Sequence, residues 1–215
     1  MFRIVFLVII SWLIIGCKQS QSDSFKLPYY NEPTFTPIFV KDSTKIEKEI
    51  SHKINDFSFL NQDSVFINQN DIEGKIHIAN FIFTTCGSIC PVMTRNLKIV
   101  NDSLSSEKNL VLLSYSVTPW IDSHKVLKNY KSDYGINNTN WHFLTGNKNA
   151  IYQLARQSYF AEEDIGFSKD STEFLHTEHF ILVDKTKRIR GIYNGTLTLE
   201  MKQLVEDYKI LKANN

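Results

Sequence analysis

The 215-residue sequence has no excess of either charge, no internal repeat and only 3 cysteines. Lysine and arginine total 24 residues against 23 for aspartate and glutamate. This balance gives no electrostatic reason to expect nucleic acid or an anionic membrane surface as a partner. With 42% apolar and 22% charged residues, the composition is that of an ordinary soluble domain. The length predicts one domain with further residues for a tail or linker.

The sequence also lacks an apolar run long enough for a typical membrane-spanning helix. Such a helix needs about 20 residues, whereas the almost unbroken run Ile4–Ile15 stops at Gly16. An apolar run of this length after the positive charge of Arg3 is typical of a secretory signal.

The end of this run, Leu13-Ile-Ile-Gly-Cys17, resembles the lipobox that the bacterial lipoprotein signal peptidase cleaves. The resemblance implies a lipoprotein signal peptide over residues 1–17 and a lipidated Cys17. The protein would then belong to the cell envelope, lipid-anchored to a bacterial membrane with its domain in the periplasm. An uncleaved anchor or a plain signal peptide is the alternative interpretation, and each of them also places the domain outside the cytosol.

Residues 18–50 are predicted to form a polar tether between the anchor and the domain, which would comprise residues 51–215. The beginning of this segment has no apolar periodicity, and it contains Pro28, Pro33 and Pro37. Such a segment is expected to hold a domain away from a membrane.

The remaining sequence predicts an α/β protein with a thioredoxin-like fold. Apolar runs predict strands at Ile76–Phe83, Leu110–Val117 and Trp141–Leu144, and helical periodicity follows each of them. Strands that alternate with helices indicate a mainly parallel sheet covered on both faces. The full set predicts a central mixed sheet flanked by helices, with an extra N-terminal β-hairpin; the hairpins are expected at Asp56–Ile67 and His179–Tyr193, and the last helix at Leu199–Leu211.

Two cysteines stand at the junction between the first of these strands and the next helix, in Cys86-Gly-Ser-Ile-Cys90-Pro91. If Cys17 carries lipid, they form the remaining pair in a compartment where disulfides persist. A structural disulfide across so short a loop would contribute little chain entropy, so a functional pair is favoured. The start of a helix favours thiolate, the form that attacks disulfides and binds soft metals.

Spacing alone does not decide between redox chemistry and metal binding, whereas a third ligand would. His176 and His179 lie where the chain enters the final hairpin, and strand alternation puts them on opposite faces. His176 is the better candidate for a ligand, with a surface histidine as the alternative interpretation. The other histidines are interpreted as structural (His77, His142 and His179) or as exposed (His52 and His124).

Three segments together resemble the Sco/SenC family over roughly residues 53–211: Phe83–Thr94, Ser114–Asp122 and the hairpin that follows His176. That family consists of membrane-tethered, copper-binding proteins of thioredoxin fold that assist assembly of the copper centre of cytochrome c oxidase. The resemblance implies that Cys86, Cys90 and His176 bind copper. It also implies a copper-bearing subunit of the oxidase, or another copper protein, as the partner.

The sequence departs from the family pattern in three places. Gly87 replaces the usual proline after the first cysteine, and Thr118 replaces an aspartate, while Asp122 is shared. The turn that begins at Asp184 also differs from the family's Gly-Pro-x-Gly. None of these changes removes an expected ligand.

The leading hypothesis is thus a membrane-tethered copper chaperone, whose redox-active pair Cys86 and Cys90 could also give it thiol–disulfide oxidoreductase activity. The alternative is an extracytoplasmic thiol–disulfide oxidoreductase that uses Cys86 and Cys90 to reduce partner cysteines and needs no histidine. A peroxiredoxin-type peroxidase shares the fold, but Thr85-Cys86 does not reproduce its Thr-x-x-Cys spacing. A purely structural lipoprotein domain would leave the thiol pair without a role.

Overall fold

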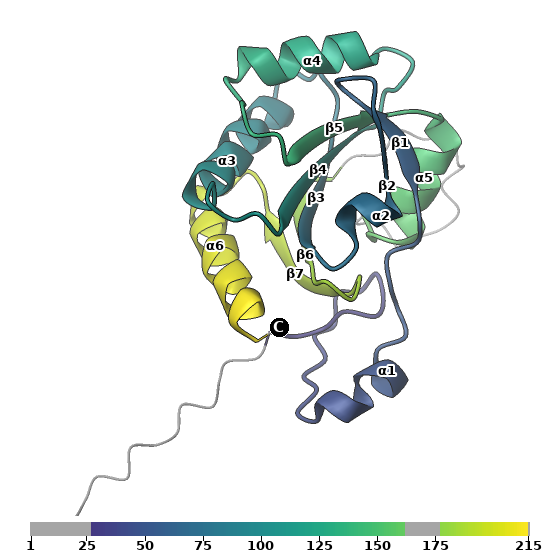
Figure 1. Cartoon of the computed structure of the whole chain (residues 1–215), viewed down its shortest axis with the longest axis vertical. Coiled ribbons are helices and arrows are strands. Elements are labelled where there is room, and N and C mark those ends of the chain that lie inside the picture. Colours follow the sequence, from purple (N-terminus) through teal and green to yellow (C-terminus); the bar gives the residue numbers. More distant parts are fainter. Residues whose placement is uncertain (1–26, 162–176, 215) are drawn as a thin grey trace, which may run out of the picture.

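A mixed seven-stranded sheet with helices on both faces forms the centre of the protein (Figure 1). The computed structural model describes residues 27–161 and 177–214. In chain order the elements are a 3₁₀ turn Ser43–Lys45, α1 Ile46–Glu49, β1 Ser58–Asn61, β2 Phe66–Asn68, α2 Gln69–Ile72, β3 Ile76–Ile82, α3 Ile89–Ser103, β4 Leu110–Ser116, α4 His124–Asp133, β5 Trp141–Thr145, α5 Lys148–Gln157, β6 His179–Val183, β7 Ile189–Asn194 and α6 Thr198–Ala213. The predicted thioredoxin-like α/β fold is confirmed.

The strand order is β2-β1-β5-β4-β3-β6-β7. Strands β3, β4 and β5 run parallel, with Ile82 of β3 paired to Ser116 of β4, so their carboxyl ends share one edge of the sheet. Strand β6 runs antiparallel to β3, and β7 antiparallel to β6. The chain therefore enters β6 and leaves β7 at the same edge. This thiol edge, as we call it, carries the loop with Cys86.

The predicted N-terminal hairpin extends the sheet beyond β5. Strand β1 pairs antiparallel with both β2 and β5. The side chain of Asn61 closes the turn, because its Oδ1 accepts hydrogen bonds from the backbone N–H groups of Asp63 and Val65, both at 2.9 Å. Ser64 adopts a left-handed φ of 62°, which the tight turn requires.

Alternating side chains of each central strand enter two separate cores. On β3, Ile78 and Ile82 pack on the face covered by α3 and α6, while Ala79 and Phe81 pack on the opposite face with α5. Figure 1 shows α3 and α6 together on one side of the sheet and α5 on the other. Burial on both faces explains why the strand appears in the sequence as a continuous apolar run.

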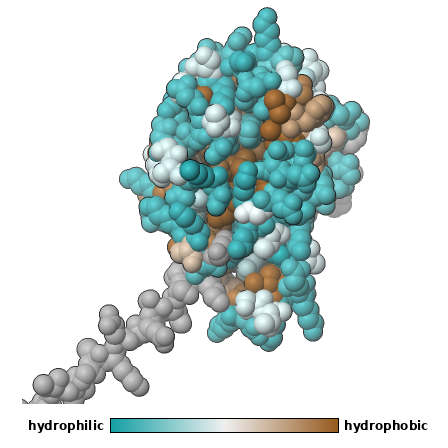
Figure 2. All heavy atoms as spheres, in the orientation of Figure 1, coloured by the Kyte–Doolittle hydropathy of each residue, from teal (hydrophilic) through white to brown (hydrophobic). Residues whose placement is uncertain are grey.

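The outer surface in the same view is mainly hydrophilic, with apolar side chains gathered in a few patches (Figure 2). Within residues 27–161 and 177–214, none of the helices has the length and apolar character needed to cross a bilayer.

The structure agrees with the interpretation of His77 as structural and of His124 as exposed, and it corrects the interpretation of His52. His77 is buried, its Nε2 lies 3.1 Å from the hydroxyl of Tyr159, and desolvation lowers the pKa of this imidazole to about 3. His124 is exposed, as expected. The prediction of an exposed His52 is wrong: its ring is half-buried, stacks on Phe160 with centroids 4.2 Å apart, and lies with Nε2 2.8 Å from the carbonyl of Ser158. An aromatic partner about 100 residues away in sequence gives no local signal.

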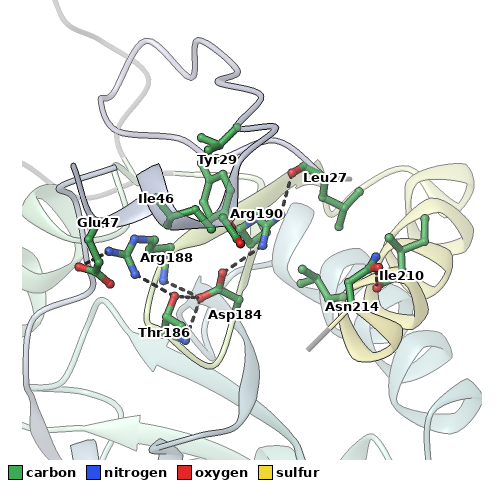
Figure 3. A pocket seen from close by; sticks show the side chains of 13 residues that line it. Leu27, Tyr29, Ile46, Glu47, Asp184, Thr186, Arg188, Arg190, Ile210 and Asn214 are labelled. Carbon is green, nitrogen blue, oxygen red and sulfur yellow. Dashed lines mark hydrogen bonds and ion pairs between the residues drawn. The ribbon is translucent and has the colours of Figure 1, made fainter. Parts of the chain in front are cut away.

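Residues 27–50, predicted as part of the tether, instead pack against the domain beside β7 (Figure 3). The structure therefore corrects the prediction for this part of residues 18–50. Leu27, Tyr29, Val40 and Ile50 are buried, and Tyr29 pairs with Ile38 in an isolated antiparallel bridge. Isolated apolar residues between polar ones give no periodic pattern, which is why the sequence did not indicate this contact.

Two buried arginines hold this segment: Arg190 of β7 and Arg188, which directly precedes that strand. Arg190 donates from Nη2 to the carbonyl of Leu27 at 2.7 Å and from Nε to that of Pro28 at 2.9 Å, and its guanidinium lies 3.7 Å from the centre of the Tyr29 ring. Arg188 donates from Nε to the carbonyl of Ile50 at 3.2 Å. Each guanidinium therefore satisfies backbone acceptors that the segment would otherwise bury unpaired.

Carboxylates balance both guanidinium charges. Nη1 of Arg190 lies 3.1 Å from Asp184 Oδ2, and Nη2 of Arg188 lies 2.9 Å from Oε2 of the exposed Glu47. The Arg190–Asp184 pair is buried on both sides. Removing one member of such a pair leaves the other charge without compensation.

We expect Arg190→Leu to lower the free energy of unfolding by about 3–5 kcal/mol, because Asp184 is then buried without its cation. The same variant should make residues 27–50 more susceptible to limited proteolysis. Denaturant unfolding and proteolysis followed by mass spectrometry measure the two effects.

Lys187→Met on the same hairpin is the control. The partly exposed pair of Lys187 with Asp56 should contribute less than about 1 kcal/mol. Equal losses in the two variants would contradict a specific role for Arg190.

Candidate functional site

The first cysteine lies in the loop between β3 and α3, at the thiol edge. A turn follows β3, in which the backbone N–H of Cys86 donates to the carbonyl of Phe83 at 3.2 Å. Helix α3 begins at Ile89, so Cys90 belongs to its first turn and Cys86 precedes it. Cys86 therefore lies outside the helix, and the two cysteines do not share one helical face. The loop nevertheless turns back on the helix, and the two thiol groups are hydrogen-bonded to each other.

Backbone N–H groups at the start of α3 surround the Cys86 sulfur. Burial raises the pKa of this thiol. Hydrogen bonds from the backbone of Cys90, Ser88 and Ile89 lower the pKa by more than burial raises it, so the net pKa is below the ordinary value. The first N–H groups of a helix have no partner within the helix, so they are available to a thiolate. Cys86 is thus partly exposed and favours the reactive form.

Cys90 has the opposite properties. Its side chain is only 3% exposed and packs into the core between the sheet and helices α3 and α6. Desolvation raises the pKa of Cys90 to about 12, and the charges of Cys86 and Asp122 act in the same direction. The pair therefore combines one accessible, acidic thiol with one buried thiol that retains its proton.

Asp122 lies under the loop that carries Cys86. Its side chain is fully buried, and its carboxylate accepts hydrogen bonds from Thr84 on the loop. The sequence singled out this residue as the nearby carboxylate. It gave no sign of the contribution of Thr84, because a threonine pair before a cysteine has no distinctive pattern.

The third expected ligand, His176, lies outside the described residues, as does the expected lipidation site Cys17. Among the residues that the structure describes, no three histidine, cysteine or acidic side chains form a group that could hold a metal. His179, the alternative histidine of the hairpin, begins β6 and lies against the Phe35 ring with centroids 5.6 Å apart. This contact agrees with the structural role that the sequence predicts for His179.

Gly87 occupies open space within the loop. A Cβ atom built at this position would meet no heavy atom within 4 Å, and the φ angle of Gly87 is not in the left-handed region. The loop conformation therefore does not require glycine at the position where the family usually has proline.

The chain belongs to the SCO1/SenC family, whose model matches residues 46–211. A SCO1 protein homolog of Bacillus subtilis (strain 168) is 29% identical over 167 residues, which cover 77% of this chain and 86% of the relative. The expected family is thus confirmed.

Solved structures of the same family share the fold. The structure of BsSco, reported for its disulfide switch as a member of the Sco family of cytochrome c oxidase assembly proteins, has a TM-score of 0.64 and 28% identity and covers 76% of this chain and 95% of its own. A SCO1/SenC family lipoprotein from Bacillus anthracis str. Ames has a TM-score of 0.65 and 26% identity, with 75% and 95% covered. Copper-bound ScoI of Bradyrhizobium japonicum, at 21% identity and a TM-score of 0.59, has the same fold over 73% of this chain and 98% of its own.

The unequal thiols predict selective alkylation. In the reduced chain at about pH 7, iodoacetamide should modify Cys86 at least about tenfold faster than Cys90, because only the thiolate is nucleophilic. The Cys86 rate should rise with pH and level off above its lowered pKa, whereas Cys90 should remain slow until the pH approaches about 12. Peptide mass spectrometry of time points measures both rates, and equal rates would contradict the assigned asymmetry.

The open space at Gly87 predicts that Gly87→Ala raises the free energy of unfolding by about 0.4–1 kcal/mol, because the unfolded chain loses more freedom than the native loop. Gly74→Ala is the matched control, since Gly74 has a left-handed φ of 70° and an alanine there would be strained. Denaturant unfolding of the two variants should give changes of opposite sign.

Proposed function

We propose that this protein is a membrane-tethered copper-binding protein that assists assembly of the copper centre of cytochrome c oxidase. Cys86, Cys90 and His176 would hold the copper, which is cargo rather than a resident catalytic group. The observation that carries the proposal is the pair of free thiols in contact at the start of α3. Two thiolates and an imidazole form a soft donor set that suits Cu(I) and can also hold Cu(II) with further donors.

The position of Thr177, the residue after His176, supports the assignment of His176 as the third ligand. Thr177, the first described residue after it, precedes β6, and β6 runs antiparallel to β3 with Ile181 opposite Ala79. The chain therefore approaches β6 from the edge at which β3 ends and the Cys86 loop begins. The histidine would complete the site from the neighbouring strand.

Each protein ligand would have its own role in taking up and releasing the metal. The accessible Cys86 can meet an incoming donor, while the buried Cys90 must lose its proton when it binds. Because a disulfide offers no thiolate, the pair must be reduced before copper enters. Metal transfer and dithiol chemistry are thus linked through the same two sulfurs.

The membrane tether is proposed from the segment at residues 1–17, with lipid on Cys17. The Bacillus anthracis relative is a lipoprotein of this family, which supports the assignment. The domain would then work in the periplasm, and the partner would be the copper-bearing subunit of the oxidase or another copper protein. BsSco belongs to a family of oxidase assembly proteins, which supports the oxidase as the target.

The unequal thiols also favour a second candidate, a thiol–disulfide oxidoreductase that reduces partner cysteines. An accessible thiolate at Cys86 would attack a partner disulfide, and the buried Cys90 would then displace the partner. This reaction needs no histidine ligand and no metal.

A copper titration of the reduced chain tests the leading proposal. We expect about one copper ion per chain to bind, with binding lost in Cys86→Ser and in Cys90→Ser. Loss of even an outer-shell partner weakens metal sites by about 10–100-fold, so His176→Ala should weaken binding by at least about 100-fold. Spectroscopic titration against a competing chelator measures these affinities, with Cys17→Ser in every variant so that only two thiols remain.

His124→Ala is the matched control, because His124 is exposed on α4 and has no proposed role. Copper binding that persists in both cysteine variants would refute the metal site. Full activity towards partner disulfides with negligible copper affinity would select the oxidoreductase instead.

A further inference from the structure

The carboxylate of Asp122 connects the loop of Cys86 to the end of β4. Its side chain is 0% exposed, and it accepts from Thr84 Oγ1 at 2.5 Å, from Ser116 Oγ at 2.6 Å and from Thr118 Oγ1 at 2.9 Å. The backbone N–H of Thr84 donates a longer bond of 3.3 Å to the same group. One side chain thus receives four hydrogen bonds from three places in the chain.

All of these donors are uncharged. Among the described residues, Asp122 has no recorded ion pair with lysine, arginine or histidine. A buried carboxylate without a cation is costly and persists only where hydrogen bonds satisfy its oxygens. An apolar side chain could fill the same space at lower cost but could accept none of these hydrogen bonds, so a purely space-filling role does not account for Asp122.

The bond to Thr84 acts on the turn that places the first thiol. Thr84 and Thr85 are the central residues of the turn closed by the Cys86 N–H and the Phe83 carbonyl. Thr84 is therefore held through both its hydroxyl and its backbone N–H, while the exposed Thr85 has no recorded side-chain hydrogen bond among the described residues. The carboxylate fixes one side of the turn and leaves the other free.

We propose that Asp122 is a positioning residue, which through Thr84 holds the turn so that the Cys86 sulfur stays against Cys90. The proposal deepens the proposed function, since it concerns the same thiol pair. Ser116 and Thr118 hold the carboxylate on the β4 side. The position of the loop is therefore fixed relative to the sheet and not to α3 alone. By holding the turn, Asp122 would raise the effective concentration of the Cys86 thiol near the Cys90 thiol.

Disulfide formation measures that effective concentration without copper. Oxidised glutathione takes two electrons and two protons from the two thiols and becomes two molecules of reduced glutathione, while a bond forms between the sulfurs of Cys86 and Cys90. The equilibrium constant of this exchange rises with the effective concentration of the pair. Failure of copper binding would therefore not affect this readout.

The test compares two isosteric changes in the same turn. The full chain in detergent, with Cys17→Ser throughout, is equilibrated with glutathione buffers, and the reduced fraction is measured by thiol labelling. Loss of one hydrogen bond to a charged group should lower the exchange constant of Thr84→Val by about tenfold. Thr85→Val, the control, should change it by less than about twofold.

Two variants of Asp122 distinguish the effect of its hydrogen bonds from the effect of its negative charge. The amide of Asp122→Asn can accept from the Thr84 N–H and donate to a hydroxyl, so it should retain most of the exchange constant. Asp122→Ala removes both bonds to the turn and should lower the constant at least as far as Thr84→Val. Denaturant unfolding of each variant shows whether it is folded under the exchange conditions.

If Thr84→Val and Thr85→Val have equal exchange constants while both remain folded, the positioning role is refuted. It is also refuted if Asp122→Asn falls as far as Thr84→Val, because the charge rather than the hydrogen-bonded shape would then control the pair. An unchanged constant in a folded Asp122→Ala protein leads to the same conclusion.

Discussion

The parallel pairing of β3 with β4 is the constraint on which the site depends. The two strands stay in register from Ile76 with Leu110 to Ile82 with Ser116, and the Val117 N–H then donates to the Ile82 carbonyl at 2.9 Å. This register brings the loop after β3 directly over the loop after β4. Without it, Thr84 and Asp122, which are 38 residues apart, would not meet. The thiols are thus positioned by the sheet before any contact of their own.

The opposite end of the sheet carries the attachment of the N-terminal segment. Asp184 follows Val183, which pairs with His77 near the start of β3, whereas Cys86 follows the end of that strand. The contacts of Arg188 and Arg190 with residues 27–50 therefore lie at the far end of the strands from the thiols. A tether that leads from Leu27 to a membrane would depart from that end. If the protein carries the proposed lipid anchor, the thiol edge would face away from the point of attachment. A partner could then reach the thiol edge.

Much of the fold followed from patterns that act locally. Continuous apolar runs identified the buried strands, and a thiol pair before Pro91 marked the junction of β3 with α3. The hairpin β1–β2 was visible as two short runs around a polar turn. These features depend on neighbours in sequence, which a pattern records. The family resemblance favoured His176 as a predicted copper ligand, whereas its position in the sequence alone could not separate it from a surface histidine.

The features that the sequence did not reveal depend on distant partners. The burial of His52 requires Phe160, and the packing of residues 27–50 requires Arg188 and Arg190. The role proposed for Thr84 depends on the carboxylate of Asp122, which lies in the loop after β4. The exact start of α3 was also not predicted: the helix begins only at Ile89, and the turn after β3 uses the residues before it. Spacing alone cannot locate the first residue of a helix.

The inequality of the thiols connects the two chemistries proposed for the site. The start of α3 stabilises the Cys86 thiolate, while the core around Cys90 disfavours charge. A bound copper ion would change this balance, because its positive charge compensates a second thiolate that burial alone would forbid. In the proposed function, Cys90 would therefore be a thiolate ligand while copper is bound and a protonated resolving thiol while the site is empty. The same burial that retains its proton keeps it close to Cys86, so the reduced site is prepared for either a metal or a partner disulfide.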